Sequence, residues 1–176
     1  MEIEENQSGR RAGKWGRITG SETDVCSDPI FPLACVAGRG LVVLDTNIVL
    51  DLWVFNDPAA QPLSQALKAG RLRWLATSAM RDELARVLGY AHIAARLPPG
   101  SLGADGVLQA FDRHALLVDA PARAGITCSD PDDQKFIDLA VLYRAVLLSK
   151  DNAIFCMKKQ LLALGVKAQI AIEFVA

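Results

Sequence analysis

The chain has 176 residues and a formal net charge of −1 at pH 7, which excludes a generally basic nucleic-acid coat protein. Hydrophobic residues make up 51 % of it and charged residues 22 %, so it can bury a sizeable core and is not intrinsically disordered. No apolar run approaches the roughly 20 residues of a membrane helix, and we expect no membrane partner.

Residues 1–40 differ in composition from the rest of the chain. They are rich in Gly, Ser, Arg and Glu and show neither helical nor strand periodicity, which is typical of a flexible tail. The acidic start, Met1–Asn6, does not resemble a secretory signal, so we expect a cytoplasmic protein. We therefore predict a flexible N-terminal tail over 1–40 and one folded domain over 41–176.

From Leu41 onward, apolar runs typical of strands alternate with helical patterns. The expected strands are 41–44, 72–76, 116–118, 145–149 and 169–172, and the expected helices are 47–54, 58–69, 78–88, 100–114, 133–144 and 152–164. Gly70 is expected to end the second helix and Ser78 to cap the third. This alternation predicts the α/β class, a three-layer α/β/α sandwich with a central parallel sheet.

An acid directly follows the first strand. Ligands of an open α/β sheet bind at the carboxyl ends of its strands, where Asp45 is placed. A carboxylate next to four buried residues must be hydrogen-bonded or metal-bound, because burial otherwise penalises its charge. Thr46 and Asn47 either cap the next helix or support a metal site. The strand at 145–149 repeats the pattern, since Ser149 and Asp151 stand at its end.

Two other acidic segments lie between these strands. Glu83 sits beside the apolar stripe of its helix and can lean toward the sheet edge, whereas Asp82 should point to solvent. From its position alone, Glu83 is as readily a solvated side chain as a ligand. Asp130, Asp132 and Asp133 precede the most strongly helical segment, and three acids exceed what a helix cap requires. Spacing does not say which of the three would be functional.

The rest of the composition favours oxygen ligands for any metal. The four cysteines form no CxxC pair, and the two histidines are isolated from other metal-binding residue types. Several carboxylates gathered at one sheet edge would repel each other unless a divalent cation neutralised them. Because oxygen ligands suit hard cations, we expect Mg²⁺ or Mn²⁺.

These residues, in this order, resemble the PIN-domain family of metal-dependent ribonucleases, which includes the toxins of VapC-type toxin–antitoxin pairs. The resemblance covers about 41–175 and depends on Leu-Asp-Thr-Asn at 44–47, the Glu in the helix after the second strand, Asp-Pro-Asp-Asp-Gln-Lys-Phe at 130–136 and Ser-Lys-Asp at 149–151. It assigns the four acidic positions to Asp45, Glu83, Asp133 and Asp151. Many relatives carry an acid at the position of Gln134, and Ser149 replaces the usual Thr.

The resemblance implies an endoribonuclease that uses one or two Mg²⁺ or Mn²⁺ ions to activate water and stabilise the leaving oxygen. Asp45 would be the central ligand, supported by Thr46, Asn47 and Ser149. RNA phosphates would be contacted by nearby basic side chains, for which we select Arg81, Lys135 and Lys150. The expected partners are an RNA substrate, a small antitoxin that blocks the acidic pocket, and a second copy of the chain in a homodimer.

Other readings of the strand-ending acid fit less well. A haloacid-dehalogenase-type phosphatase needs a second acid two residues later, where this chain has Asn47. A dinucleotide-binding fold needs GxGxxG after the first strand, which is missing. The alternative that stays open is a PIN-like module with weak or absent catalysis that binds RNA or protein. The sequence does not identify the RNA target.

Overall fold

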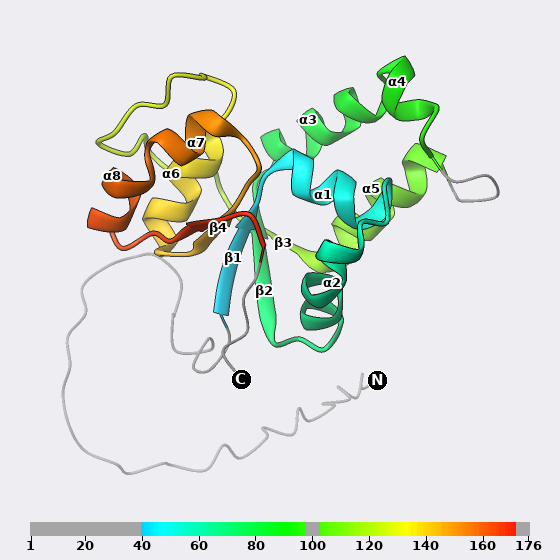
Figure 1. Ribbon diagram of the computed structural model, residues 1–176, viewed down its shortest axis with the longest axis horizontal. Coiled ribbons are helices and arrows are strands. Elements are labelled where there is room, and N and C mark those ends of the chain that lie inside the picture. Colours follow the sequence, from blue (N-terminus) through cyan, green and yellow to red (C-terminus); the bar gives the residue numbers. More distant parts are fainter. Residues whose placement is uncertain (1–39, 98–102, 172–176) are drawn as a thin grey trace, which may run out of the picture. The chain divides into compact units, whose positions relative to one another are not determined.

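The computed structural model describes residues 40–97 and 103–171 (Figure 1). Its strands are β1 (Gly40–Leu44), β2 (Leu72–Ala76), β3 (Ala115–Leu117), β4 (Val146–Leu148) and β5 (Ala168–Gln169). Its helices are α1 (Thr46–Trp53), the 3-10 helix η2 (Pro58–Ala60), α2 (Gln61–Lys68), α3 (Ser78–Leu88), α4 (Ala91–Ala94), α5 (Gly103–His114), α6 (Gln134–Tyr143), α7 (Asn152–Cys156) and α8 (Lys158–Ala163).

The strands form one parallel sheet in the order β3-β2-β1-β4-β5. Figure 1 shows α1 to α5 on one side of this sheet and α6 to α8 on the other. Right-handed crossovers explain this division, because β1 to β3 step outward in one direction, whereas β4 and β5 are added on the other side of β1. The predicted α/β/α sandwich with a central parallel sheet is confirmed.

The chain extends the sheet in one direction from β1 to β3 and in the opposite direction from β4 to β5, so the order of the strands reverses between β1 and β4. In open α/β folds the crevice outside the carboxyl ends of such neighbouring strands is where ligands bind. The two strands are in register from Val42 opposite Val146 to Leu44 opposite Leu148. The residues that follow Leu44 and Leu148 therefore emerge side by side at one edge of the sheet.

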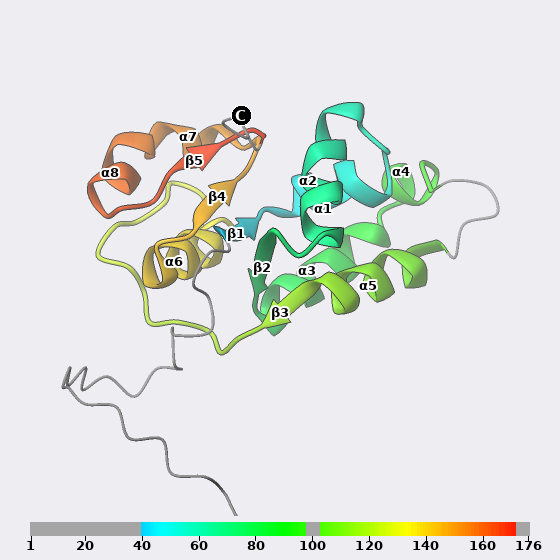
Figure 2. The same cartoon turned by 90° about the horizontal axis from the view of Figure 1, so that it is seen from below.

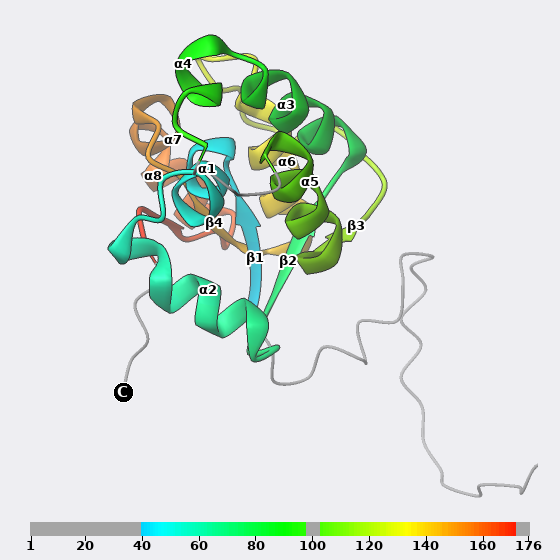
Figure 3. The same ribbon diagram turned by 90° about the vertical axis from the view of Figure 1, so that its right-hand side faces the viewer.

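Helices cover the central strands on both faces and exclude water from them. Val42 and Val43 of β1 have no exposed surface, and α6 packs on β1 and β4. On β2, the ring of Trp74 meets Phe111 of α5 edge to face, with 4.6 Å between centroids. Figures 2 and 3 show α3 and α5 side by side, with α4 beyond the end of α3. The candidate site thus stands on a rigid, dry support.

Several element boundaries differ from the sequence prediction. The expected helix 58–69 begins with the 3-10 turn η2, and Thr77 rather than Ser78 is the N-cap of α3. The expected helix 152–164 is two helices, because Met157 leaves helical geometry at φ −92° and ψ 2°. α4 has four residues, too few to produce a periodic pattern. Gly70 ends α2 with a φ of 66°, as predicted.

The predicted tail lies outside the described residues except for Gly40, which opens β1 opposite Leu72. Within 40–97 and 103–171, no helix is both long and apolar enough to cross a membrane. The last predicted strand is described only in part, and β5 covers Ala168–Gln169.

Candidate active site

The carboxyl ends of β1 and β4 are joined at Asp45. Its N–H donates to the carbonyl of Leu148 over 2.9 Å, which continues the ladder between the two strands. The Ser149 hydroxyl donates to Asp45 Oδ2 over 2.7 Å and accepts the N–H of Asp151 over 2.9 Å. One hydroxyl therefore links two predicted site acids that come from different strand ends.

Asp45 is a buried carboxylate, with 3 % of the residue exposed. Burial raises its pKa, and the nearby charge of Glu83 adds to the rise. The Ser149 hydroxyl and the N–H groups of Thr46 and Asn47 lower the pKa but do not outweigh burial. The side chain of Asn47 itself is exposed, whereas Thr46 is buried. The immediate surroundings of Asp45 thus leave its negative charge only partly compensated.

Glu83 lies on α3 and contacts Thr46, the residue that follows Asp45. The Thr46 hydroxyl donates to Glu83 Oε1 over 2.9 Å, which fixes the carboxylate near the start of α1. Glu83 Oε2 forms an ion pair with the Lys135 ammonium of α6. Asp82, the next residue back, is exposed as predicted. The structure therefore selects Glu83 as the acid of α3 that turns toward the sheet edge.

Asp133 is the acid of the 130–133 segment that turns inward. It is 8 % exposed, and its Oδ2 is buried without a hydrogen-bond donor among the described residues. Its pKa is raised to about 7, mainly by burial and to a smaller extent by the negative charges of Asp45, Asp151 and Asp130. Asp130 and Asp132 are exposed, and Asp130 Oδ1 accepts the N–H of Asp132 over 2.8 Å.

Gln134, where the family resemblance implies an acid in many members, contacts the loop before α6 and Asp138 instead of the four predicted site acids. Its Oε1 accepts the N–H of Cys128 over 2.8 Å, and its Nε2 donates to the carbonyl of Ile126 and to Asp138 Oδ1. Asp138 Oδ1 also accepts the N–H of Ala124 over 2.8 Å. This network attaches the loop before Asp130 to α6, and Gln134 is thus part of the support rather than of the acidic group.

Asp151 stands at the N-terminus of α7. Its Oδ1 accepts the N–H of Ala153 over 2.7 Å, so it caps this short helix, and it is half-buried. Its charge also raises the pKa of Asp133. The structure therefore brings all four predicted acids to one region. Charge repulsion couples Asp133 to Asp45 and Asp151, and Glu83 to Asp45.

The three basic residues selected as RNA contacts all have carboxylate partners within the chain. Arg81 forms two bonds with Asp112 of α5, over 2.6 and 2.8 Å, and Lys135 pairs with Glu83. Lys150 contacts two carboxylates, Asp51 and Asp57. An RNA phosphate would have to compete with these partners, and phosphate contact by the three residues stays a prediction.

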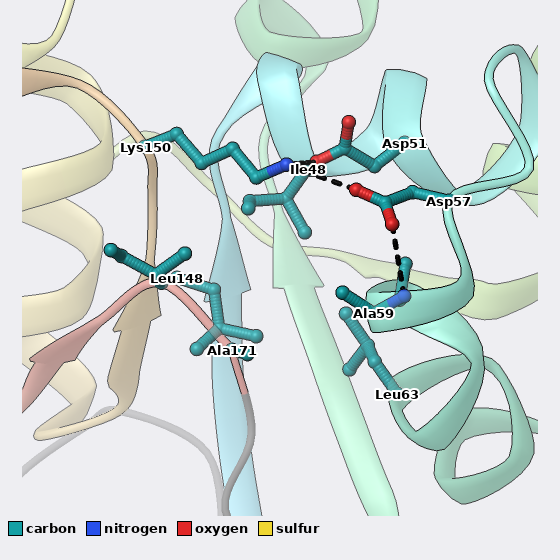
Figure 4. Close-up of a pocket in the computed structure, with 10 residues that line it drawn as sticks. Ile48, Asp51, Asp57, Ala59, Leu63, Leu148, Lys150 and Ala171 are labelled. Atoms are coloured by element: carbon teal, nitrogen blue, oxygen red, sulfur yellow. Dashed lines mark hydrogen bonds and ion pairs between the residues drawn. The ribbon is translucent and has the colours of Figure 1, made fainter.

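Asp51 and Asp57 were not singled out in the sequence. Asp51 lies in α1 and is 8 % exposed, and Asp57 caps η2 by accepting the N–H of Ala59. Figure 4 shows Lys150 reaching both carboxylates above a pocket whose apolar wall includes Ile48 and Leu148. The available signal was an acid inside the otherwise largely apolar helix 46–53, a position that needs a charged partner.

The donor chemistry of the site fits a hard divalent cation. The candidate ligands are all carboxylate oxygens, and the buried Oδ2 of Asp133 has no other partner in the described part of the chain. Within 40–97 and 103–171, no three His, Cys, Asp or Glu side chains form a complete metal-binding group as they stand. Lys135 and the hydroxyls of Thr46 and Ser149 contact the carboxylates instead.

Known proteins share this fold. A family model described as "PIN domain" matches residues 41–153, so the chain belongs to the PIN-domain family. The solved structures include a similar chain in the crystal structure of VapBC2 from Rickettsia felis bound to a DNA fragment from their promoter. The match has a TM-score of 0.50 and 12 % identity, and it covers 73 % of this chain and 97 % of that chain. At that identity the likeness establishes a common fold. No curated protein matches the chain.

Proposed function

We propose that the protein is a Mg²⁺- or Mn²⁺-dependent endoribonuclease that hydrolyses RNA phosphodiester bonds where β1 and β4 end. The main support is Asp133, a buried carboxylate whose Oδ2 has no hydrogen-bond partner among the described residues and whose pKa is raised to about 7 by burial and by the charges of three other acids. A fold does not retain such repulsion for stability alone, and perturbed carboxylates in a crevice are typical of functional sites. Membership of the PIN-domain family supports the same reaction class.

Asp45, Glu83, Asp133 and Asp151 would hold the cation, with Asp45 at the centre. A bound Mg²⁺ or Mn²⁺ supplies positive charge that polarises the phosphate and makes water a better nucleophile. Ser149 keeps Asp45 oriented through its 2.7 Å hydrogen bond, and Thr46 does the same for Glu83 over 2.9 Å. Lys135 neutralises Glu83 in the structure, so the cation would compete with this ammonium for the carboxylate.

The proposal extends to a toxin–antitoxin setting in the cytoplasm. The similar solved chain belongs to a VapBC2 complex, which suggests a small antitoxin protein as the natural partner. A basic or apolar segment of such a partner would block the acidic pocket, and a basic one would also compensate the charge of the carboxylates without a metal. A homodimer is proposed from the family resemblance, and light scattering of the purified chain would test it.

Cleavage of end-labelled single-stranded RNA by purified protein in Mn²⁺ tests the reaction. We expect cutting that stops with EDTA and in Asp45→Asn, because the variant removes a central carboxylate charge while it preserves the shape of the side chain. Asp82→Asn is the matched control, since it neutralises an exposed acid adjacent to Glu83 and should cut normally. Full activity in Asp45→Asn would overturn the assignment of the site.

A binding module with weak catalysis is the second candidate. It is favoured by Lys135, which occupies Glu83 as an internal counter-ion, and by the lack of a complete metal-binding group in the described residues. The same assay separates the two functions. If folded, partner-free protein binds several RNA classes but cuts none of them in Mn²⁺ or Mg²⁺, the binding module replaces the nuclease.

A further inference from the structure

Lys150 is the centre of an ion triad next to the candidate site. Its ammonium lies 2.7 Å from Asp51 Oδ2 and 3.2 Å from Asp57 Oδ2 (Figure 4). The backbones of these two residues are also connected, because the N–H of Asp57 donates to the carbonyl of Asp51 over 2.9 Å. The triad therefore ties the loop after β4 to α1 and to the turn that follows α1.

The tied loop also carries two of the candidate site residues. Ser149 precedes Lys150 and bonds Asp45, and Asp151 follows Lys150 and donates its N–H to Ser149 Oγ. Three consecutive residues are thus fixed at different points, with Lys150 pointing to α1 and its neighbours serving the acidic group. A shift of the Lys150 side chain would be transmitted through one peptide unit to each neighbour.

We propose that Lys150 is a positioning residue, which holds the loop after β4 so that Ser149 and Asp151 meet Asp45 in the geometry the reaction needs. This inference rests on the proposed nuclease function. It assigns Asp51 and Asp57 to the same task, because they hold the ammonium in place. Lys150 then acts on the cation site through its neighbours and does not contact the RNA.

The charges of the triad argue against Lys150 as a phosphate contact. Two carboxylates face one ammonium, so the group carries no free positive charge for an anion. Moving Lys150 to a phosphate would leave Asp51, which is 8 % exposed, without its ionic partner. A buried charge that loses its partner is strongly unfavourable.

Three variants compared with wild type separate the two roles. Lys150→Met removes the ammonium, and Asp51→Asn removes the charge of its nearer partner, so that the lysine keeps only Asp57 and is more available to a phosphate. Lys167→Met is the matched control, because it removes an exposed lysine just before β5, at the opposite ends of the strands. For each protein we would measure kcat and KM for RNA cleavage, the Mn²⁺ concentration for half-maximal rate, Mn²⁺ affinity by calorimetry, and Tm.

A positioning role predicts the same defect in Lys150→Met and Asp51→Asn. We expect kcat to fall about 10- to 100-fold and the Mn²⁺ requirement to rise about 10-fold, since groups that orient metal ligands have effects of this size. KM for RNA should stay within about twofold, and Lys167→Met should behave as wild type. A phosphate contact predicts instead that Lys150→Met raises KM, while Asp51→Asn leaves it unchanged or lowers it. That result overturns the inference.

Loss of stability alone is a separate outcome. If both variants lower Tm but keep wild-type kcat and Mn²⁺ affinity well below Tm, the triad only stabilises the fold and the inference is wrong. The Mn²⁺ measurements also separate this inference from the proposed function. If wild type binds Mn²⁺ but cuts no RNA, the proposed nuclease function is wrong. If Lys150→Met then binds Mn²⁺ with the same affinity as wild type, the positioning role of Lys150 is wrong as well. Wild type that neither binds Mn²⁺ nor cuts RNA overturns both.

Discussion

At the scale of single residues, Asp133 shows how tertiary packing selects one acid among neighbours. Asp130, Asp132 and Asp133 stand at the same helix start, where each is compatible with a capping role. Only Asp133 is buried, because the Gln134 network holds the preceding loop against α6 and turns this side chain inward. The contacts of Gln134 span the loop and cannot be read from spacing, so the sequence alone left the choice open.

Other site positions were accessible to sequence reasoning. Asp45 and Asp151 follow apolar strands, and the rule that ligands bind at strand ends predicted that they would lie together. Glu83 was ambiguous, and its hydrogen bond from Thr46 settles its direction. The ion triad was missed because Lys150 and its partners are about 100 positions apart, and no local pattern joins them.

Neutralising Asp133 should stabilise the metal-free protein. Its folded pKa of about 7 lies above the ordinary 3.8, so the native state binds the extra proton and stability is lost as pH rises between these values. Asp133→Asn does not titrate and keeps its stability over this range. The difference in free energy of unfolding between the variant and wild type should therefore grow from pH 4 to pH 7 and then level off. We expect a gain of at most about 4 kcal/mol at pH 8, because each unit of pKa difference corresponds to about 1.4 kcal/mol.

Urea unfolding in EDTA at pH 5 and pH 8 measures this effect. Asp132→Asn is the control, because it neutralises an exposed acid one position away and should change little. An Asp133→Asn protein that is less stable than wild type at pH 8 would show that the carboxylate has a stabilising partner, and the picture of an unsatisfied acid would fail.

At the scale of elements, the pattern of apolar residues predicted those helices and strands whose signal lies within one segment of the chain. The 72–76 strand has the predicted bounds, β1 begins one residue earlier than predicted, β3 is shifted by one residue, and β4 and β5 are shorter in the described part of the chain. Long apolar periodicity located α6 as well. The break between α7 and α8 was not visible, because Ile154 and Leu161 are both buried and keep one apolar face across Met157. The shared face conceals the turn.

Helix α6 and the loop before it should be sensitive to the charge of residue 134. Gln134→Glu replaces the amide that donates to Asp138 Oδ1 over 2.7 Å and so places a second carboxylate beside Asp138. Two carboxylates at this separation repel when both are ionised. We expect Tm to fall by several degrees at pH 8 and by less at pH 5, where one of them can hold a proton.

Thermal unfolding at the two pH values tests this element. Gln160→Glu is the matched control, since it makes the same change at an exposed position of α8. Gln134→Glu with wild-type Tm at pH 8 would mean that the new carboxylate has turned to the cation site, and activity measurements would then show it as an added ligand.

At the scale of the whole molecule, cation binding should stabilise the fold. A ligand that binds only the native state raises stability in proportion to the logarithm of its concentration, by about 2.7 kcal/mol at 100 times Kd. We expect millimolar Mn²⁺ to raise the Tm of wild type by several degrees and that of Asp45→Asn by much less. Scanning calorimetry with Mn²⁺, Mg²⁺ and EDTA measures both proteins. Equal shifts in the two proteins would place the cation elsewhere.

The fold as a whole was predictable because strands and helices alternate so regularly. Alternation implies parallel strands, and the right-handed crossover rule limits where the helices can lie. The strand order was not predicted, since it depends on which side of β1 the fourth strand is added. That choice arises from packing between α6 and the sheet, which a single sequence does not display.

The join between β1 and β4 also determines when the site exists during synthesis. The hydroxyl that holds Asp45 comes from a residue 104 positions later in the chain. A ribosome that stops before Ser149 releases a chain with three of the four acids and without the hydroxyl that orients the first. A cell is therefore exposed to the assembled site only after most of the domain has been translated and β4 has taken its place beside β1.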